Sequence, residues 1–397
     1  MRIVVRYLCA IGLLVFAGAG CTRPSPAPAA APPPVLRVGT SGDYAPFSVN
    51  RDNAPSGLDV EIAERLGRDL GMRVEFTPVS WPQLAAATQR GDFDIAMCGV
   101  TMRAERAQIG RYTRPYATVG AVALIRAGDA QRFSSVSALD RPGVRIAVHA
   151  GGHLERVARE HFPAAEIESV ADNAAVPGRV VDGSADAAVT DTAEVGGWMR
   201  PTLRVLGPFS LDHKAYLLPV DRDQLALRVD EWLVAREADG WLDGERVKWI
   251  GAAAHTDPAT ASRDSVAALI RLRLDIMPSV AAVKRAAGLP IEDPAQEERV
   301  IERARAGSSQ PARAEAVYRS LIAMAKSVEE AAPAPDTAAS LADLRGAIGR
   351  VDAQLLRELD RAPHGSVEQW QVVLEQNLSL PGIDATALNQ LAAALAS

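Results

Sequence analysis

The sequence predicts a multidomain protein in which an α/β domain is followed by an all-helical domain. Up to about residue 250, short apolar runs typical of buried strands alternate with amphipathic helical patterns, as in α/β sheets. Beyond residue 263 the apolar spacing is helical throughout. The length of 397 residues also suits two or three domains. We therefore divide the chain into segments 1–21, 22–34, 35–250, 251–263 and 264–397.

The first segment is typical of a secretory signal, because Arg2 and Arg6 precede an apolar run, Leu8–Ala19, that is too short to span a membrane. Gly18-Ala19-Gly20-Cys21 resembles a lipoprotein processing site, at which Cys21 would carry a lipid anchor. Cleavage in the alanine-rich stretch is the alternative. Either way we expect a periplasmic protein, anchored to the membrane if Cys21 is acylated. Segment 22–34 is rich in proline and alanine and predicts an extended linker.

Composition excludes several classes of function. A net charge of −6 without a basic stretch argues against nucleic acid as a partner. Two of the three cysteines lie in the leader, so neither a disulfide framework nor a zinc site is predicted. We expect no metal and no cofactor.

The α/β domain is predicted element by element. Leu58, Ile62, Leu66 and Leu70 share one face of a helix over 58–70. A second helix is expected to start at Trp81-Pro82 with Ser80 as its cap, and a third at Gly151-Gly152-His153. The predicted strands are Val35–Gly39, Val74–Phe76, Asp94–Met97, Val144–Val148 and a short strand that ends near Asp191.

Two carboxylates, Asp191 and Glu194, stand at the end of that last strand, where α/β sheets bind their ligands. One acid could hold a cation or an amino group, and the other could donate a proton. The residues alone also allow a structural interpretation, in which Asp191 caps the next helix and Glu194 is solvated in its first turn.

A motif series identifies a family for residues 35–250. Val38–Phe47, Gly57–Asp59, Gly91–Asp94 and the run from Thr101 through Arg106 to Tyr116 resemble the amino-acid-type periplasmic solute-binding proteins. The resemblance implies two α/β lobes, a hinge and a ligand cleft, with Thr101 and Arg106 clamping a ligand carboxylate. We expect the second lobe to begin near Gly128 and the chain to return around Lys214–Pro219.

Within that family the sequence is most similar to the cyclohexadienyl dehydratases, which convert prephenate or arogenate to phenylpyruvate or phenylalanine. The similarity lies in Thr40–Tyr44, Ser80–Pro82, Thr190-Asp191 with Glu194, and Lys214–Pro219. It implies that Glu194 is the general acid, with a pKa raised by burial and by Asp191. Substrate contacts are expected from Asp43, Trp81, Thr101, Arg106, Gly152, His153, Asp191 and Lys214. His149 and His153 replace the asparagine and threonine usual in this loop, which affects substrate preference.

The helical domain is predicted to open with one long helix over Ser265–Ala287, capped by Asp264 and ended by Gly288-Leu289-Pro290. Arg273 and Lys284 are eleven residues apart, about three turns, so they share a face. Two cations on one face suit a dianionic ligand, and a solvated basic stripe is the alternative.

Residues 273–294 resemble the exported all-helical chorismate mutases, which implies an all-α chorismate mutase domain. In that class Arg273 and Arg345 would hold substrate carboxylates, Lys284 would meet the ether oxygen, and protonated Glu329 would donate to it. Gln296 stands where the class has an arginine, and Arg299, one turn on, could substitute.

The two resemblances imply a bifunctional exported enzyme, a chorismate mutase (isomerase) and prephenate/arogenate dehydratase (lyase). Its substrates would be chorismate and prephenate or arogenate. One alternative is a non-catalytic binding protein for an amino acid or aromatic acid with a degenerate helical domain. Another is a sensory module in which the helical domain reads lobe closure. Both resembled classes can self-associate, so a homo-oligomer stays open.

Overall fold

The computed structural model describes residues 33–51, 54–331, 333 and 338–397. The predicted signal segment 1–21, with Cys21, lies outside these residues, as does most of the predicted linker 22–34. One compact unit spans Pro34–Ser397. None of the described helices is both long enough and apolar enough to cross a membrane.

The first lobe is built on a five-stranded sheet of order β5-β1-β6-β15-β7, with β15 antiparallel to its neighbours. The helix predicted over 58–70 is confirmed as α1, in which Leu58, Ile62 and Leu66 are fully buried. The chain between β1 and α1 forms a separate three-stranded sheet of order β2-β3-β4. The elements are β1 Val35–Thr40, β2 Asp43–Tyr44, β3 Ser48–Arg51, β4 Ala54–Ser56, α1 Leu58–Leu70, β5 Arg73–Pro78, α2 Leu84–Arg90, β6 Ile95–Ala96, α3 Ala104–Ile109, β7 Gly110–Tyr112 and β15 Leu217–Pro219.

The second lobe has its own five-stranded sheet of order β11-β10-β12-β9-β13. Its bounds are β9 Ala121–Arg126, β10 Arg145–His149, α4 His153–His161, β11 Glu166–Val170, α5 Val176–Val181, β12 Ala187–Asp191, α6 Val195–Trp198 and β13 Leu203–Leu206. The predicted start near Gly128 is wrong, because β9 already pairs with β12 from Ala121 onward. Gly128 lies beyond the far end of that strand.

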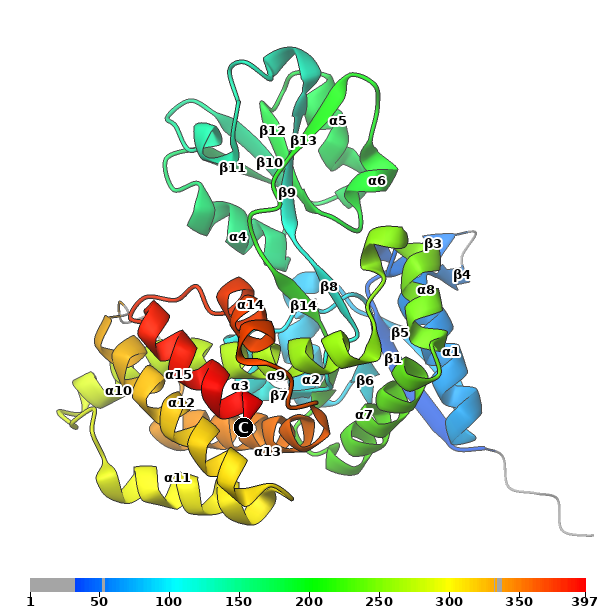
Figure 1. Ribbon diagram of the computed structural model, residues 1–397. Coiled ribbons are helices and arrows are strands. Elements are labelled where there is room, and N and C mark those ends of the chain that lie inside the picture. Colours follow the sequence, from blue (N-terminus) through cyan, green and yellow to red (C-terminus); the bar gives the residue numbers. More distant parts are fainter. Residues whose placement is uncertain (1–32, 52–53, 332, 334–337) are drawn as a thin grey trace, which may run out of the picture. The chain divides into compact units, whose positions relative to one another are not determined.

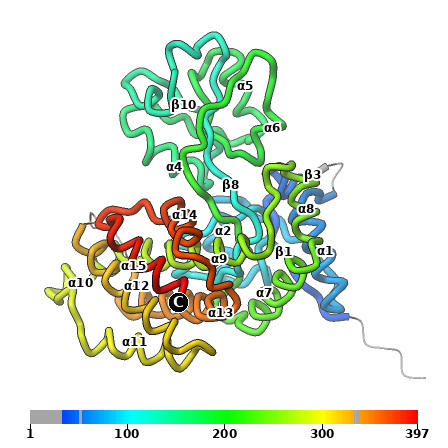
Figure 2. Tube along the Cα trace, in the orientation of Figure 1, coloured from blue at the N-terminus to red at the C-terminus, as the bar shows by residue number. Residues whose placement is uncertain are grey.

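Two antiparallel strands connect the lobes. The chain leaves the first lobe through β8, Ala117–Val119, and returns through β14, Asp212–Lys214, which pairs with β8. Figures 1 and 2 show these two passages side by side. The return predicted around Lys214–Pro219 is confirmed, and it places Lys214 at the hinge.

The helical domain departs from the prediction at its beginning. Its first helix starts at Pro258, inside the predicted linker, because Asp257 caps it through the backbone N–H groups of Ala259 and Thr260. The predicted long helix is broken at Ile276, where Pro278 removes a backbone donor. Helices α7 Asp223–Ala238 and α8 Trp241–Trp249 precede α9 Pro258–Asp275, α10 Met277–Ala286, α11 Pro294–Gly307, α12 Pro311–Ala331, α13 Leu341–Arg361, α14 Val367–Asn377 and α15 Ala385–Ala396.

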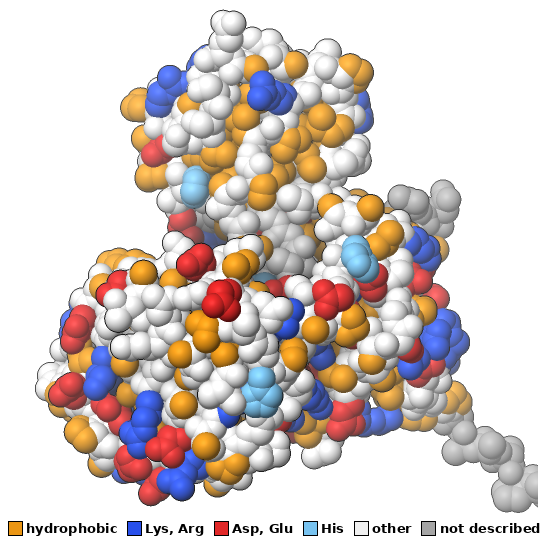
Figure 3. Space-filling model, viewed as in Figure 1, with side chains coloured by type: hydrophobic (Ala, Val, Ile, Leu, Met, Phe, Trp, Pro, Cys, Tyr) orange, Lys and Arg blue, Asp and Glu red, His pale blue; other side chains and the backbone are white. Residues whose placement is uncertain are grey.

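The helical domain packs on the first lobe through a continuous apolar core. Polar contacts accompany it: the buried Arg114 Nη1 lies 3.7 Å from Glu358 Oε2, and the partly buried Arg350 Nη2 donates to the carbonyls of Ala107 and Gln108 at 2.9 and 3.1 Å. The latter carbonyls belong to α3, the helix that carries Arg106. On the face shown in Figure 3, acidic and basic side chains are interspersed over the helical domain, unlike a nucleic-acid-binding track.

Candidate functional site

A cleft between the two lobes holds most residues predicted for the dehydratase site. The first lobe contributes Trp81, Thr101 and Lys214 to its lining, and the second contributes Gly152, His153 and Glu194. Tyr44, Gly99, His149, Leu154 and Asn173 complete it. The cavity measures only about 30 Å³, whereas ligand cavities usually reach about 300–1,000 Å³. The lobes must therefore move apart to admit a ring-sized ligand.

Glu194 lies just after β12, directly before α6, and its side chain is buried. Asn173 Nδ2 donates to Glu194 Oε1 at 2.7 Å, and Thr190 Oγ1 donates to Oε2 at 2.8 Å. Burial, and then the negative charge of Asp191, raise the pKa of Glu194 to about 8. At neutral pH this carboxyl group therefore keeps its proton, as a general acid requires.

Asp191 has both of the roles that the sequence allowed, as a cap of the following turn and as a neighbour of a cation. Its Oδ1 accepts the backbone N–H groups of Ala193 and Glu194 at 3.0 and 2.9 Å, so it does cap the turn. Its Oδ2 accepts the Tyr44 hydroxyl and lies 3.8 Å from Lys214 Nζ. Asp191 does not line the cavity, and its role in substrate binding stays a prediction.

Lys214 and Arg106, the two cationic side chains predicted for the cleft, differ in their contacts and in their access to the cavity. Lys214 is almost fully buried, donates from Nζ to Thr101 Oγ1 at 2.8 Å and lies 5.1 Å above the Tyr44 ring. Arg106 donates from Nη1 to the Thr101 carbonyl at 3.2 Å and does not line the cavity. In this closed cleft Lys214 is thus better placed than Arg106 to meet a ligand anion.

His149 and His153, at either end of the loop between β10 and α4, make further polar contacts. His153 Nε2 lies 2.9 Å from Asp212 Oδ1, and burial lowers the pKa of His153, so its ring is neutral at pH 7. Neutral His153 then donates from Nε2, and Nδ1 is an acceptor. His149 Nε2 lies 3.6 Å from Asp43, whose Oδ1 accepts the Trp81 indole N–H at 3.1 Å. Asp43 thus positions Trp81 and is not itself part of the cavity lining.

Two polar residues of the cleft lining were missed by the sequence analysis. Tyr44 belongs to a quoted motif but had no assigned role, and Asn173 lies in a short turn without any motif. Both make contacts between lobes: Tyr44 with Asp191, and Asn173 Nδ2 with the Asp43 carbonyl at 3.0 Å. Such long-range pairs leave no local signal in the sequence.

A second cavity, of about 810 Å³, lies among α9–α13 of the helical domain. All five residues predicted for the mutase site line it: Arg273, Lys284, Gln296, Glu329 and Arg345. Arg273 and Lys284 meet there although they stand on separate helices rather than on one helical face.

The centre of the predicted mutase chemistry is an ion pair. Lys284 Nζ lies 2.9 Å from Glu329 Oε2 and donates to the Ile291 carbonyl at 2.8 Å. The pKa of Glu329 is raised, because burial outweighs the opposing effect of Lys284. A raised pKa favours the protonated form that donation to an ether oxygen requires.

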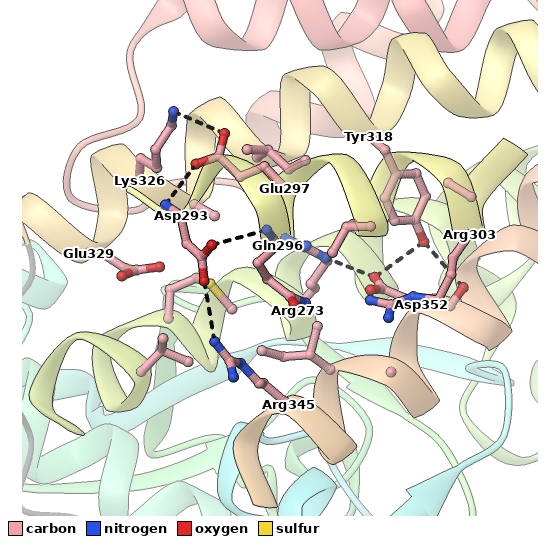
Figure 4. Close-up of a pocket in the computed structure, with 18 of the residues that line it drawn as sticks. Arg273, Asp293, Gln296, Glu297, Arg303, Tyr318, Lys326, Glu329, Arg345 and Asp352 are labelled. Carbon is pink, nitrogen blue, oxygen red and sulfur yellow. Dashed lines mark hydrogen bonds and ion pairs between the residues drawn. The ribbon is translucent and has the colours of Figure 1, made fainter. Parts of the chain in front are cut away.

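The remaining polar groups of this pocket are mostly paired. Arg273 Nε lies 2.9 Å from Asp352 Oδ1, which also accepts the Tyr318 hydroxyl at 3.2 Å. Gln296 Oε1 accepts two hydrogen bonds from the Arg299 guanidinium, at 3.2 and 2.9 Å. Arg299 is exposed and does not line the cavity, so its suggested substitution for the missing arginine is not supported by its position. Figure 4 shows Arg273, Gln296, Glu329 and Arg345 around the pocket, together with Asp352, Tyr318 and Arg303, which the sequence analysis missed.

Comparisons with known proteins agree with the division of the chain into a two-lobed part and a helical domain. Residues 36–252 match the family "Bacterial extracellular solute-binding proteins, family 3", and residues 264–330 match "Chorismate mutase type II". The cyclohexadienyl dehydratase of Pseudomonas aeruginosa is 36% identical over 223 residues, which is 54% of this chain and 82% of that protein. The L-cystine-binding protein of Escherichia coli is 26% identical over 55% of this chain and 83% of that protein.

Among solved structures, an ancestral amino-acid-binding protein described as a precursor of cyclohexadienyl dehydratase is similar with a TM-score of 0.52. It is 34% identical over 54% of this chain and 95% of that one. The chain therefore belongs to family 3 of the bacterial extracellular solute-binding proteins, and a chorismate mutase type II domain follows its two-lobed part.

Proposed function

We propose that the protein is a bifunctional enzyme that converts chorismate to prephenate in the helical pocket and dehydrates prephenate or arogenate in the two-lobed cleft. The observation that carries the dehydratase half is the buried carboxyl of Glu194, whose pKa of about 8 keeps a proton available at the cleft. The 36% identity to a cyclohexadienyl dehydratase supports the same assignment.

In the dehydration step, Glu194 gives its proton to the ring hydroxyl, which leaves as water. The ring carboxylate leaves as carbon dioxide, and its bonding electron pair completes the aromatic ring. One proton is consumed for each prephenate, so charge and atoms balance. Lys214 and Thr101 would bind the side-chain carboxylate, and Trp81 would line the ring. A protonated acid in a dry cleft contributes typically about 10²–10⁴-fold to such a step.

In the rearrangement step no covalent intermediate and no net proton transfer are needed. The pocket holds the two substrate carboxylates so that the reacting carbons approach each other. Lys284 and protonated Glu329 then stabilise the negative charge that develops on the ether oxygen. Their 2.9 Å contact supports this proposal, because it brings both groups to one point of the cavity lining.

One assay tests both halves. Purified protein is given chorismate, and chorismate, prephenate and phenylpyruvate are followed together by chromatography, with prephenate alone and arogenate alone as parallel substrates. We expect chorismate to disappear and phenylpyruvate to form, and arogenate to yield phenylalanine if it is accepted. If neither prephenate nor arogenate is turned over while an amino acid binds tightly, the cleft is that of a binding protein.

We also propose that the protein acts in the periplasm. The family consists of extracellular proteins by its description, and the first 21 residues have the pattern of a secretory signal. Fractionation of cells that express the full chain, with a Cys21→Ser variant beside it, tests both export and anchoring. Release of the variant, but not of the parent, from the membrane fraction would support acylation.

A further inference from the structure

The helical pocket is lined by five cationic side chains, and four of them are already paired with carboxylates. Arg273 is paired with Asp352 at 2.9 Å and Lys284 with Glu329 at 2.9 Å. Arg345 lies 3.7 Å from Asp293, and Lys326 lies 3.4 Å from Glu297. The fifth is Arg303, for which no hydrogen bond or ion pair is found within the described residues.

Arg303 reaches the pocket because of its place on α11. Gln296, Val300, Arg303 and Gly307 follow one another at helical spacing and all line the cavity. Arg303 therefore lies two turns beyond Gln296 on the same face. Gln296 itself contributes no charge, and its amide oxygen is occupied by Arg299 on the outside.

A second unsatisfied donor lies in the same part of the pocket. Arg273 uses Nε for Asp352, while its Nη1 is buried without a hydrogen-bond partner. A buried guanidinium N–H without a partner is costly, so it favours an acceptor from outside the chain. In Figure 4, Arg303 lies on the same side of the pocket as Tyr318 and Asp352, with Glu329 on the opposite side. The Arg273 guanidinium lies 5.9 Å from the centre of the Tyr318 ring. Burial raises the pKa of Tyr318, and the positive charges of Arg273 and Arg303 both oppose that rise.

We infer that Arg303 is a substrate-binding residue that, together with Nη1 of Arg273, anchors one carboxylate of a dicarboxylate ligand at the end of the pocket opposite Lys284 and Glu329. This inference rests on the proposed mutase function. A dianion that enters the pocket must otherwise compete with a protein carboxylate for every cation. Arg303 offers a charge without such competition, so it replaces part of the positive charge that the neutral Gln296 does not supply.

The test compares Arg303→Gln with Arg299→Gln, a matched control on the same helix that lies outside the cavity. We expect Arg303→Gln to raise the KM for chorismate at least about tenfold, the loss typical of a charged hydrogen bond, with a smaller change in kcat. Arg299→Gln should leave KM within about twofold of the parent value. Arg303→Lys should recover part of the affinity, since a merely structural role would not follow the charge.

Dehydration of prephenate by the same variants serves as the folding control, because that cleft shares no lining residue with the helical pocket. A KM for Arg303→Gln equal to that of the parent would overturn the inference. If the parent chain turns over no chorismate, the proposed mutase function fails. In that case calorimetric binding of chorismate to parent and Arg303→Gln decides the inference separately, and equal affinities, or no binding to either protein, would refute it.

Discussion

Replacement of Glu194 by glutamine is the sharpest perturbation of the cleft. Glutamine has the same shape, and its amide oxygen can still accept from Asn173 while its amide N–H donates to the Thr190 hydroxyl. The two hydrogen bonds of 2.7 and 2.8 Å that hold the native side chain therefore have counterparts in the variant. What the variant loses is the transferable proton, so the change isolates the acid from its surroundings.

The expected loss can be estimated from general acid catalysis. Removal of a positioned acid should lower kcat for prephenate about 10²–10⁴-fold. With a pKa of about 8, roughly nine-tenths of Glu194 is protonated at pH 7. Parent activity should therefore be nearly constant below pH 7 and fall about tenfold per pH unit well above 8, whereas the residual activity of the variant should lack this limb.

The same proton also affects stability. The carboxyl of Glu194 keeps a proton up to about pH 8 in the folded protein, but an unfolded glutamate loses it near its ordinary pKa of about 4.3. Between these values the folded state binds more protons, so its free energy of unfolding decreases as the pH rises. Glu194→Gln removes this dependence. The variant should gain stability relative to the parent from pH 5 to pH 8, by an amount on the order of a few kcal/mol.

The assay is phenylpyruvate formation from prephenate across pH 5–10, with thermal unfolding of both proteins in the same buffers. Chorismate consumption, which uses the other cavity, is the control for folding and should not change. Dehydration by Glu194→Gln within about fivefold of the parent, with its alkaline limb intact, would show that another group supplies the proton.

Three further expectations concern the helical pocket. Lys284→Ala should lower mutase turnover about 10²–10³-fold, the cost of one lost oxyanion donor, while prephenate dehydration is unchanged. Because burial raises the pKa of Glu329 and only its protonated form donates, mutase kcat should decrease with rising pH, and Glu329→Gln should flatten that profile. Gln296→Arg should raise mutase kcat by restoring a positive charge to the lining, and a decrease, measured as chorismate disappearance, would contradict the view that this position limits the rate.

Much of the fold was predictable because it is encoded locally. The spacing of four apolar residues predicted α1 with its observed bounds. The boundary of the second lobe was not predictable in this way, since β9 is assigned to that lobe by its pairing with β12, more than sixty residues later in the chain. The break at Ile276 had a local signal in Pro278, which the helical periodicity on both sides outweighed.

The two candidate sites were likewise predictable where the signal is local and not where it depends on contacts between distant residues. The residues that carry charge, such as Glu194 and Lys284, stand in motifs and were identified. Several distant partners of the charged residues were not: Asp352 pairs with Arg273 across 79 positions of sequence, and Tyr44 donates to Asp191 across 147. Only the three-dimensional structure shows that Asp352 is paired with Arg273, for which the sequence predicts a substrate carboxylate as partner.

Asn173 connects lobe closure to the acid of the cleft. Its amide nitrogen donates both to Glu194 Oε1 within the second lobe and to the Asp43 carbonyl of the first, at 2.7 and 3.0 Å. Asp43 in turn positions Trp81 and contributes to the raised pKa of Glu194. Opening the lobes would break the contact between Asn173 and Asp43 and remove that negative charge. Closure therefore assembles the wall of the cavity and brings the charge of Asp43 close to Glu194, where it adds to the larger effects of burial and of Asp191 that favour the protonated state.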